Sequence, residues 1–405
     1  MGQTVESAVV DRMVAMRRDL HQHPELSWQE HQTAERISSA LHQLEIPHHR
    51  LMGTGVVADL RGGEGLPAVA LRADIDALPI QEETGLPFAS TNDGVMHACG
   101  HDGHTSLLLG AAEILARDEN LPAPVRLIFQ PAEEKGAGAK ALIDAGVLEN
   151  VAIIYGGHLD RHFKTGTLVV AEGPASASTD YFTIRVSGRG GHAARPHETI
   201  DAVVVGALIV TAIQTIVSRE VDPSDPSIVT IGRFEAGQAP NAIAGQAELE
   251  GTIRAQSERV REHLKKSIRR VAESIGLLHQ AGLVVEITEG SPPVVNTPGA
   301  TALAYQAATE VAGEKNIRRK WRVTMGGEDF AHYLQEIPGC YIRLGARPSR
   351  DQGFPAHSSR FDFDEAALPV GASWMAAVAR RAGAALQSGD FDLTERFEED
   401  SEEES

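Results

Sequence analysis

Residues 125–159 read VRLIFQPAEEKGAGAKALIDAGVLENVAIIYGGHL, and this stretch decides the fold. It opens with a short apolar run (125–130) that suits a buried strand, and a second such run (151–159) closes it. Between the two runs, residues 139–145 have a helical pattern. Because strands that alternate with helices form mostly parallel sheets, the stretch predicts part of an α/β domain.

The same alternation continues on both sides of this stretch. We expect further strands at residues 55–62, 67–75 and 340–346, and helices at residues 5–22, 27–44, 104–116 and 365–385. The whole pattern predicts an α/β fold with a mostly parallel sheet.

The middle of the chain has a different pattern, in which strands alternate apolar and polar residues. The expected order is βαββαβ, with strands at 181–188, 227–237, 247–255 and 283–290 and helices at 200–218 and 258–275. This order suits a ferredoxin-like α+β domain, a four-stranded antiparallel sheet with two helices on one face. We therefore predict a main domain of residues 1–177 and 293–388, interrupted by an inserted domain of residues 178–292.

Composition excludes several classes of protein. The 405 residues carry 37 Lys+Arg against 56 Asp+Glu, a net charge of −19 that argues against binding nucleic acid or an anionic membrane. A hydrophobic content of 42% is enough for a packed core. The apolar run 202–218 is short for a membrane span and contains Gln214, so we expect a buried helix. Residues 389–405 are acidic without an apolar face, which predicts a disordered tail.

Cysteine content indicates the compartment. Cys99 and Cys340 are too few for a disulfide framework, which fits a reducing environment. The N-terminus lacks a basic start followed by a long apolar run, so we see no signal peptide and expect a cytoplasmic protein.

Metal-ligating residue types gather in four loops, each of which lies near the end of an expected strand. The loops are HACGHDGH (97–104), PAEE (131–134), GGH (156–158) and PAHS (355–358). Open α/β sheets bind ligands at the carboxyl ends of their strands. A thiolate with imidazoles suits Zn, Mn, Co or Ni, and of two adjacent carboxylates one can bind a metal while the other moves protons. The four loops together predict a metal site.

Two other classes of enzyme remain as alternatives. GAGAKA (136–141) matches a GxGxxA dinucleotide-binding pattern, with Asp160 about twenty residues further on, which would indicate an NAD-dependent oxidoreductase. However, Glu133 and Glu134 precede the glycines, where they would repel a pyrophosphate. A thiol hydrolase with Cys99 as nucleophile and His101 as base is the other alternative, but the two residues are close along the chain for such a pair.

A series of motifs resembles one family of enzymes along roughly residues 12–385. In chain order they are LHQHPELSWQE (20–30), LRADIDALPI (71–80), HACGHDGH, FQPAEE (129–134), GGHL (156–159), GGHAARPHE (190–198), GGEDF (326–330) and AHSSRFDF (356–363). The chain resembles dinuclear-metal amidohydrolases of the aminoacylase/carboxypeptidase superfamily. The branch is that of hippurate hydrolase, N-acyl-amino-acid aminoacylase and indole-acetyl-amino-acid hydrolase.

The resemblance implies two divalent metal ions per subunit (Mn, Zn, Co or Ni). It assigns the metal ligands Cys99, His101, Glu134, His158 and His357. It makes Glu133 the general base. Arg72 stands where the wider superfamily has a metal-binding histidine, and Asp74 is expected to orient a ligand from outside the coordination shell.

The resemblance also assigns roles to residues beyond the metal loops. It implies that His192 stabilises the oxyanion, that Asn241 and Arg254 contact the substrate, and that Gly326 and Gly327 line the leaving-group pocket. The implied reaction is hydrolysis of N-acyl amino acids, with a dipeptidase or carboxypeptidase as the alternative. The inserted domain would act as a lid and would pair subunits in a homodimer or a higher homo-oligomer.

Overall fold

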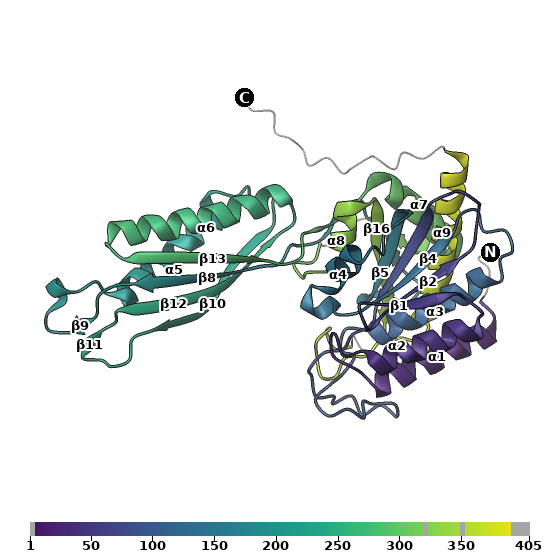
Figure 1. Cartoon of the computed structure of the whole chain (residues 1–405), viewed down its shortest axis with the longest axis horizontal. Coiled ribbons are helices and arrows are strands. Elements are labelled where there is room, and N and C mark those ends of the chain that lie inside the picture. Colours follow the sequence, from purple (N-terminus) through teal and green to yellow (C-terminus); the bar gives the residue numbers. More distant parts are fainter. Residues whose placement is uncertain (1–4, 320–322, 349–352, 390–405) are drawn as a thin grey trace. The chain divides into compact units, whose positions relative to one another are not determined.

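The computed structural model describes residues 5–319, 323–348 and 353–389. The chain divides into two compact units, Met1–Ala175 with Val295–Arg322 and Asp329–Ser405, and Ser176–Val294 with Val323–Glu328 (Figure 1). The domain limits given above remain a prediction. The predicted acidic tail, except Gly389, lies outside the described residues.

The first unit is built on an eight-stranded sheet. In spatial order its strands are β1 (His48–Leu51), β2 (Gly55–Leu60), β4 (Val125–Gln130), β3 (Ala68–Asp74), β5 (Val151–Lys164), β16 (Gly339–Arg347), β6 (Leu168–Val169) and β15 (Ile317–Arg318). The four central strands, β4, β3, β5 and β16, are parallel neighbours, and β1 and β2 add antiparallel pairs at one edge. The predicted mostly parallel α/β fold is confirmed.

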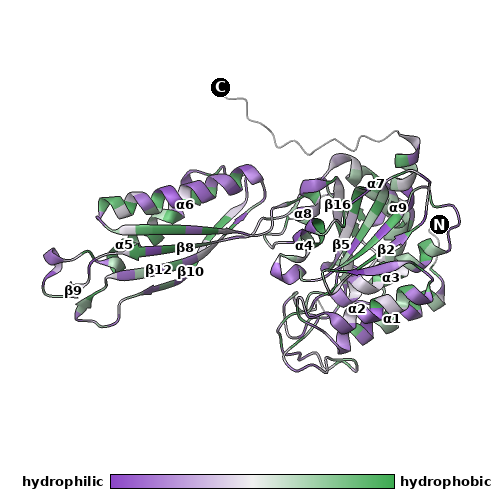
Figure 2. Cartoon of the chain, viewed as in Figure 1, coloured by the Kyte–Doolittle hydropathy of each residue, from purple (hydrophilic) through white to green (hydrophobic). Residues whose placement is uncertain are grey.

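Helices pack around this sheet. They are α1 (Ser7–Gln22), α2 (His31–Gln43), α3 (His101–Ala116), α4 (Gly138–Asp144), α7 (Pro298–Ala312), α8 (Ala331–Glu336) and α9 (Ala367–Ser388). Of these, α1, α2, α3, α7 and α9 share a hydrophobic core with the sheet. All seven residues of β3 are buried, as expected of a central parallel strand, and Figure 2 shows the neighbouring strands as largely hydrophobic. Trp374 of α9 is fully buried, and its ring N–H donates to Ala304 O of α7 at 3.2 Å.

The second unit contains a four-stranded antiparallel sheet with two helices. Along the chain its elements are β8 (Asp180–Ser187), α5 (Ala202–Arg219), β10 (Ser227–Ala236), β12 (Gln246–Ala255), α6 (Glu258–Leu278) and β13 (Gly282–Glu289). The strand order is β10-β12-β8-β13, with every pair antiparallel. This is the predicted ferredoxin-like arrangement, so the fold class is confirmed for this unit as well.

Helix α5 is apolar along most of its length. Its buried residues Val205, Ile209, Ile213 and Ile216 recur at helical spacing and belong to the core of the second unit. The opposite face is solvent-accessible and includes Val203, which is 41% exposed. By length and composition alone α5 is long enough to cross a membrane. The expected buried helix is therefore correct for one of its two faces.

Several elements differ from the sequence-based expectation. Helix α3 begins at His101 rather than His104, because Gly100 adopts the left-handed conformation (φ 98°) and turns the chain directly into the helix. The expected strand at 151–159 continues to Lys164. Short strands were not predicted, since two to four residues carry no periodicity. They are β1, β6, β7 (Gly173–Ser176), β9 (Gly191–His192), β11 (Ala242–Ile243), β14 (Val294–Asn296) and β15.

Candidate metal centre

The parallel strands bring the predicted loops to one edge of the sheet. Asp74, the last residue of β3, is paired in register with Gln130, the last residue of β4. Glu133 and Glu134 follow β4 in a single turn of 3₁₀-helix, which begins after Ala132 at a positive φ of 54°. Because neighbouring parallel strands end side by side, side chains that follow β3 and β4 meet at this edge.

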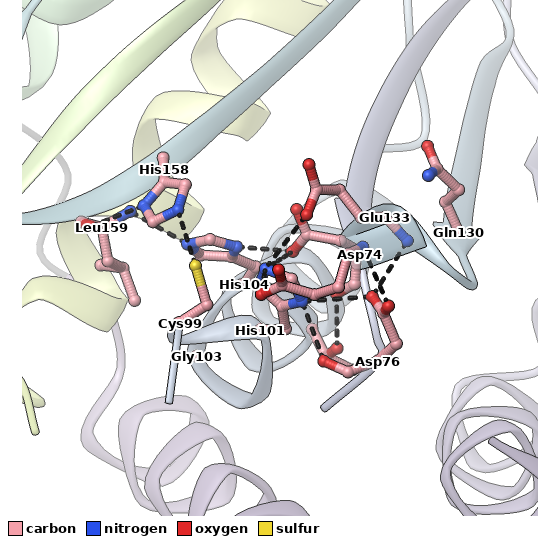
Figure 3. Close-up of polar contacts among 12 residues, drawn as sticks. Asp74, Asp76, Cys99, His101, Gly103, His104, Gln130, Glu133, His158 and Leu159 are labelled. Carbon is pink, nitrogen blue, oxygen red and sulfur yellow. Dashed lines mark hydrogen bonds and ion pairs between the residues drawn. The ribbon is translucent and has the colours of Figure 1, made fainter. Parts of the chain in front are cut away.

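A thiol and two imidazoles form the first part of the site (Figure 3). Cys99 Sγ lies 3.4 Å from His158 Nε2, and these two residues and His101 place their donor atoms within 4.8 Å of one another. His158 Nδ1 lies 2.7 Å from the carbonyl oxygen of Leu159. Since a carbonyl only accepts, Nδ1 carries the hydrogen and Nε2 keeps its lone pair on the side of Cys99.

Two carboxylates complete the group. Glu134 Oε1 lies 3.4 Å from His357 Nε2 and 3.9 Å from His101 Nε2, and Glu133 Oε2 lies 4.0 Å from His101 Nε2. Cys99, Glu134 and His357 form a second potential ligand group. The structure thus brings the five predicted metal ligands and Glu133 together.

The arrangement fits a divalent cation on two observations. Glu134 Oε1 is buried and accepts no hydrogen bond within the described part of the chain. The imidazoles of His357 and His101 face this oxygen at 3.4 and 3.9 Å, and a cation bound by all three groups would satisfy it. The donors are a thiol, imidazoles and carboxylates, which are the ligand types that Zn, Mn, Co and Ni accept.

His101 is held by the residues that follow β3. Its Nδ1 donates to the backbone oxygen of Asp76 at 2.9 Å, which directs Nε2 toward the two glutamates. Burial disfavours a charged His101, but Asp74, Cys99 and Asp76 together outweigh burial and raise the pKa of His101 well above its ordinary value. A carboxylate near a histidine ligand orients it and increases its basicity.

Asp74 and Arg72 lie at the centre of a fully buried polar network. Asp74 Oδ1 accepts from His104 Nδ1 at 2.6 Å and Oδ2 from Arg72 at 2.7 Å. Arg72 also donates to Gln130 and to Asp329, each at 2.8 Å. The guanidinium of Arg72 therefore donates hydrogen bonds to three buried side chains. Arg72 in turn anchors Asp74.

The geometry weakens both alternative classes of enzyme. Burial raises the pKa of the Cys99 thiol, whereas nucleophilic cysteines have a lowered pKa. In the GAGAKA segment, a Cβ on Gly138 would lie 1.6 Å from the backbone oxygen of Pro131. Close packing against Pro131 therefore accounts for this glycine without a dinucleotide.

The remaining predicted residues lie in the second unit. His192 of β9 is exposed and pairs with Ala242 of β11, and Ala193 N donates to Asn241 O at 3.1 Å, so His192 and Asn241 lie together at one small two-stranded antiparallel sheet. Arg254 lies on β12, 6.0 Å from the Tyr181 ring centre.

Gly326 and Gly327 also belong to the second unit. The backbone N–H of Gly326 donates to Thr324 Oγ1 at 3.1 Å, and a Cβ on Gly327 would lie 2.3 Å from the Thr179 side chain. These two glycines, His192, Asn241 and Arg254 are thus not members of the ligand group in the first unit.

Sequence reasoning assigned no role to several buried polar residues around the site. Asp76 contacts His101 and the backbone of both glutamates. His104 links Asp74 to the backbone N–H of Leu159, which lies 3.0 Å from its Nε2. Asp76 and His104 stand inside the quoted motifs, but only the fold shows what their side chains contact.

Comparison with known proteins places the chain in a family. The chain belongs to peptidase family M20/M25/M40, whose sequence profile matches residues 70–381. It is 41% identical over 377 residues to the N-acetylcysteine deacetylase of Bacillus subtilis, an alignment covering 92% of this chain and 97% of that one. It is 39% identical over 371 residues to thermostable carboxypeptidase 1 of Saccharolobus solfataricus, covering 90% and 93%.

A solved structure agrees with this family membership. The Bacillus subtilis YXEP protein, described as a dinuclear metal binding peptidase from the M20 family, has a TM-score of 0.82 and 38% identity, covering 93% of this chain and 98% of that one. The chain is accordingly a hydrolase of the amidohydrolase type, and the predicted resemblance is confirmed.

Proposed function

We propose that this enzyme hydrolyses the amide bond of N-acyl amino acids to a carboxylic acid and a free amino acid, with two divalent metal ions in its site. One observation carries the proposal: adjacent Glu133 and Glu134 face His101 Nε2 beside a thiol and further imidazoles. The N-acetylcysteine deacetylase that is 41% identical supports this substrate class by its name.

The proposed ligands are Cys99, His101, Glu134, His158 and His357. Bound metal ions would lower the pKa of a water molecule and polarise the amide carbonyl. Glu133 takes the proton from the attacking water and passes it to the leaving amine, the work of a general base that then acts as an acid. Asp74 keeps His101 oriented through the buried network with Arg72 and His104.

The second unit is proposed to supply substrate contacts. His192 would donate a hydrogen bond to the developing oxyanion, and Arg254 would bind the substrate carboxylate through its planar fork. Asn241 would contact the substrate, and Gly326 and Gly327 would line the leaving-group pocket. The unit would act as a lid.

A homodimer, a cytoplasmic location and the metals Mn, Zn, Co or Ni belong to the same proposal. Exposed apolar residues on α5 support pairing of two copies, since Val203, Val204 and Leu208 are 41%, 49% and 41% exposed. Sedimentation of the wild type and of Leu208→Glu tests the dimer. A wild-type monomer would contradict it.

A dipeptidase or carboxypeptidase is the second candidate. The 39% identical relative named thermostable carboxypeptidase 1 favours it. The two candidates share one chemistry and differ in whether the acyl group is itself an aminoacyl group. The reaction products therefore distinguish the two candidates.

The decisive experiment is a product assay with the purified holoenzyme over panels of N-acyl amino acids and dipeptides. We expect hydrolysis of N-acyl amino acids, loss of activity with EDTA, and recovery when Mn²⁺, Zn²⁺ or Co²⁺ is added. Cleavage of dipeptides alone would favour the peptidase. Activity that resists EDTA but is destroyed by iodoacetamide would establish a thiol hydrolase, and thermal stabilisation by NAD would favour the oxidoreductase.

A further inference from the structure

Asp76 receives hydrogen bonds from the backbone of both glutamates. Its Oδ1 accepts from Glu133 N at 3.1 Å, and its Oδ2 accepts from Glu134 N at 3.1 Å (Figure 3). Oδ2 also accepts from Ser27 Oγ at 2.7 Å. The side chain is 1% exposed, so these donors, rather than water, satisfy its charge.

The same residue also holds His101. The backbone oxygen of Asp76 accepts from His101 Nδ1 at 2.9 Å, and Asp76 Oδ1 lies 3.3 Å from the same nitrogen. One buried residue therefore contacts a histidine ligand, the proposed general base and a carboxylate ligand. Asp76, which follows β3, thus forms hydrogen bonds both with the turn after β4 and with the first residue of α3.

Asp76 is itself held rigidly. The neighbouring N–H of Ile75 donates to Gln130 O at 3.0 Å, and that of Ala77 donates to Glu25 O at 2.8 Å. Asp76 is therefore anchored on both sides, to the end of β4 and to the segment between α1 and α2. A carboxylate fixed in this way can fix what it binds.

The turn that carries the glutamates needs such support. Ala132 has a positive φ of 54°, a conformation that costs a residue with a Cβ about 1 kcal/mol and persists only where its surroundings enforce it. Ala132 N donates to Glu30 Oε1 at 3.0 Å, and the next two N–H groups go to Asp76. Carboxylates far away in the sequence thus bind three successive N–H groups.

Adjacent carboxylates repel each other, and without restraint the two side chains could exchange places or turn outward. Capture of both backbone N–H groups sets the direction in which each Cα–Cβ bond leaves the turn. Glu134 then points toward His357 and His101, and Glu133 lies beside it.

We propose that Asp76 is a positioning residue that assigns the two glutamates their separate tasks by binding both backbone N–H groups while its main chain orients His101. This inference rests on the proposed function for its kinetic part. Its structural part concerns how well the apoprotein is shaped for metal and stands apart from the substrate.

The test is Asp76→Asn, which keeps the shape but turns one acceptor oxygen into a donor. That donor faces Glu133 N–H at the Oδ1 position, or Glu134 N–H and Ser27 O–H at the Oδ2 position. Changes of this kind beside metal ligands cost about 10–100-fold in metal affinity or activity. We expect Mn²⁺ binding to the apoprotein, measured by calorimetry, to weaken by about that factor. At saturating Mn²⁺, kcat should fall about 10-fold or more while KM stays within about 3-fold.

Ser27→Ala is the matched control, because it removes one donor to Asp76 Oδ2 and leaves both backbone bonds in place. We expect kcat and Mn²⁺ affinity within about 3-fold of wild type. If Asp76 only stabilises the fold, Asp76→Asn will lower the melting temperature of the apoprotein, yet show wild-type kcat and affinity once folded and loaded. That result would overturn the proposal.

A double mutant shows whether Asp76→Asn lowers kcat through Glu133 or through a general disturbance of the site. With Glu133→Gln already present, Asp76→Asn should lower the residual kcat by less than about 3-fold while still weakening Mn²⁺ binding, because Glu134 remains. Full additivity of the two kcat losses would contradict positioning through Glu133. If Asp76→Asn does not fold, Asp76→Glu, which keeps the charge but adds a methylene, should show the same kcat loss, and wild-type kcat there would refute the proposal.

The same measurements distinguish this inference from the proposed function. If the wild type hydrolyses no N-acyl amino acid or dipeptide, the proposed function fails. The Mn²⁺ titration of wild type, Asp76→Asn and Ser27→Ala apoproteins still decides whether Asp76 shapes the site.

Discussion

Glu133 and Glu134 are neighbours in sequence but differ in their surroundings. Glu134 has a buried oxygen between two imidazoles, whereas Glu133 Oε2 reaches His101 Nε2 at 4.0 Å. We expect Glu133→Gln to keep its metal content and lose nearly all kcat, because the nearly isosteric amide cannot accept a proton. Glu134→Gln should lose metal first. Metal analysis after dialysis, with single-turnover kinetics, checks both, and normal turnover in Glu133→Gln would remove its assignment as base.

Arg72 is the guanidinium of the buried network. Removing it takes a charge partner away from Asp74 and from Asp329, which are both fully buried, and removing one partner of a buried pair costs about 3–5 kcal/mol. We expect Arg72→Leu to lower the stability of the first unit by about that amount in urea unfolding. The control is Arg50→Ala at an exposed pair with Glu35, where the loss should stay below about 1 kcal/mol. Equal losses in the two variants would show that the network is not a major source of stability.

A buried pair between α1 and α3 makes stability depend on pH. His21 Nδ1 of α1 lies 2.8 Å from Asp102 Oδ2 of α3, and His21 Nε2 lies 3.3 Å from Glu82. Burial disfavours the charge on His21, but these two hydrogen bonds outweigh burial and raise its pKa to about 9. When folding raises the pKa of a group, that group contributes its full stabilisation at pH values below its unfolded pKa. The contribution is lost as the pH rises through the folded pKa.

We therefore expect stability to fall between about pH 6.5 and pH 9, as the His21 contribution is lost. In His21→Gln this part of the decline should be missing. Urea midpoints measured across that window for both proteins test the expectation. Parallel pH profiles would show that the charge on His21 does not contribute.

Helix α4 begins against the turn that carries the glutamates. A Cβ on Gly138 would lie 1.6 Å from Pro131 O, a backbone atom that cannot swing away. We expect Gly138→Ala to destabilise by about 1–3 kcal/mol, or more where strain reaches the turn, and to weaken metal binding. Gly232→Ala is the control, since no atom lies within 4 Å of its Cβ position. A neutral Gly138→Ala would mean that the turn can shift freely.

The net charge of −19 acts on the whole molecule. Added salt screens the self-repulsion of an acidic protein, so we expect activity to survive, or to rise, in molar NaCl. Removing residues 389–405, which carry much of the acidic excess, should leave turnover unchanged. Rate measurements from 0.1 to about 3 M NaCl on both lengths of chain test this. A sharp loss in molar salt, or a large drop in kcat on truncation, would contradict it.

The sequence by itself determined the fold class and the chemistry of the site. Apolar runs such as 125–130 and alternating runs such as 181–188 distinguish buried parallel strands from half-exposed antiparallel ones, because the two environments select different side-chain periods. A metal site follows from the residue types of four loops and from the rule that parallel strands end at one edge. The resemblance to dinuclear-metal amidohydrolases, and not that rule, assigned Cys99, His101, Glu134, His158 and His357 as the candidate ligands.

Only the tertiary structure decided which side chains hold those ligands in place. Asp76 meets Glu133 and Glu134 across more than fifty residues of chain, and Arg72 meets Asp329 across 257. No local periodicity records such pairings, since a hydrogen bond between distant segments depends on strand order and register. The short strands escaped prediction because two to four residues carry no periodicity. The start of α3 at His101 escaped it because the backbone geometry of one residue, Gly100, sets that start rather than a repeated pattern. The sequence thus determined which chemical groups are present, and the packing of β3, β4 and α3 determined how the charged groups are oriented toward one another.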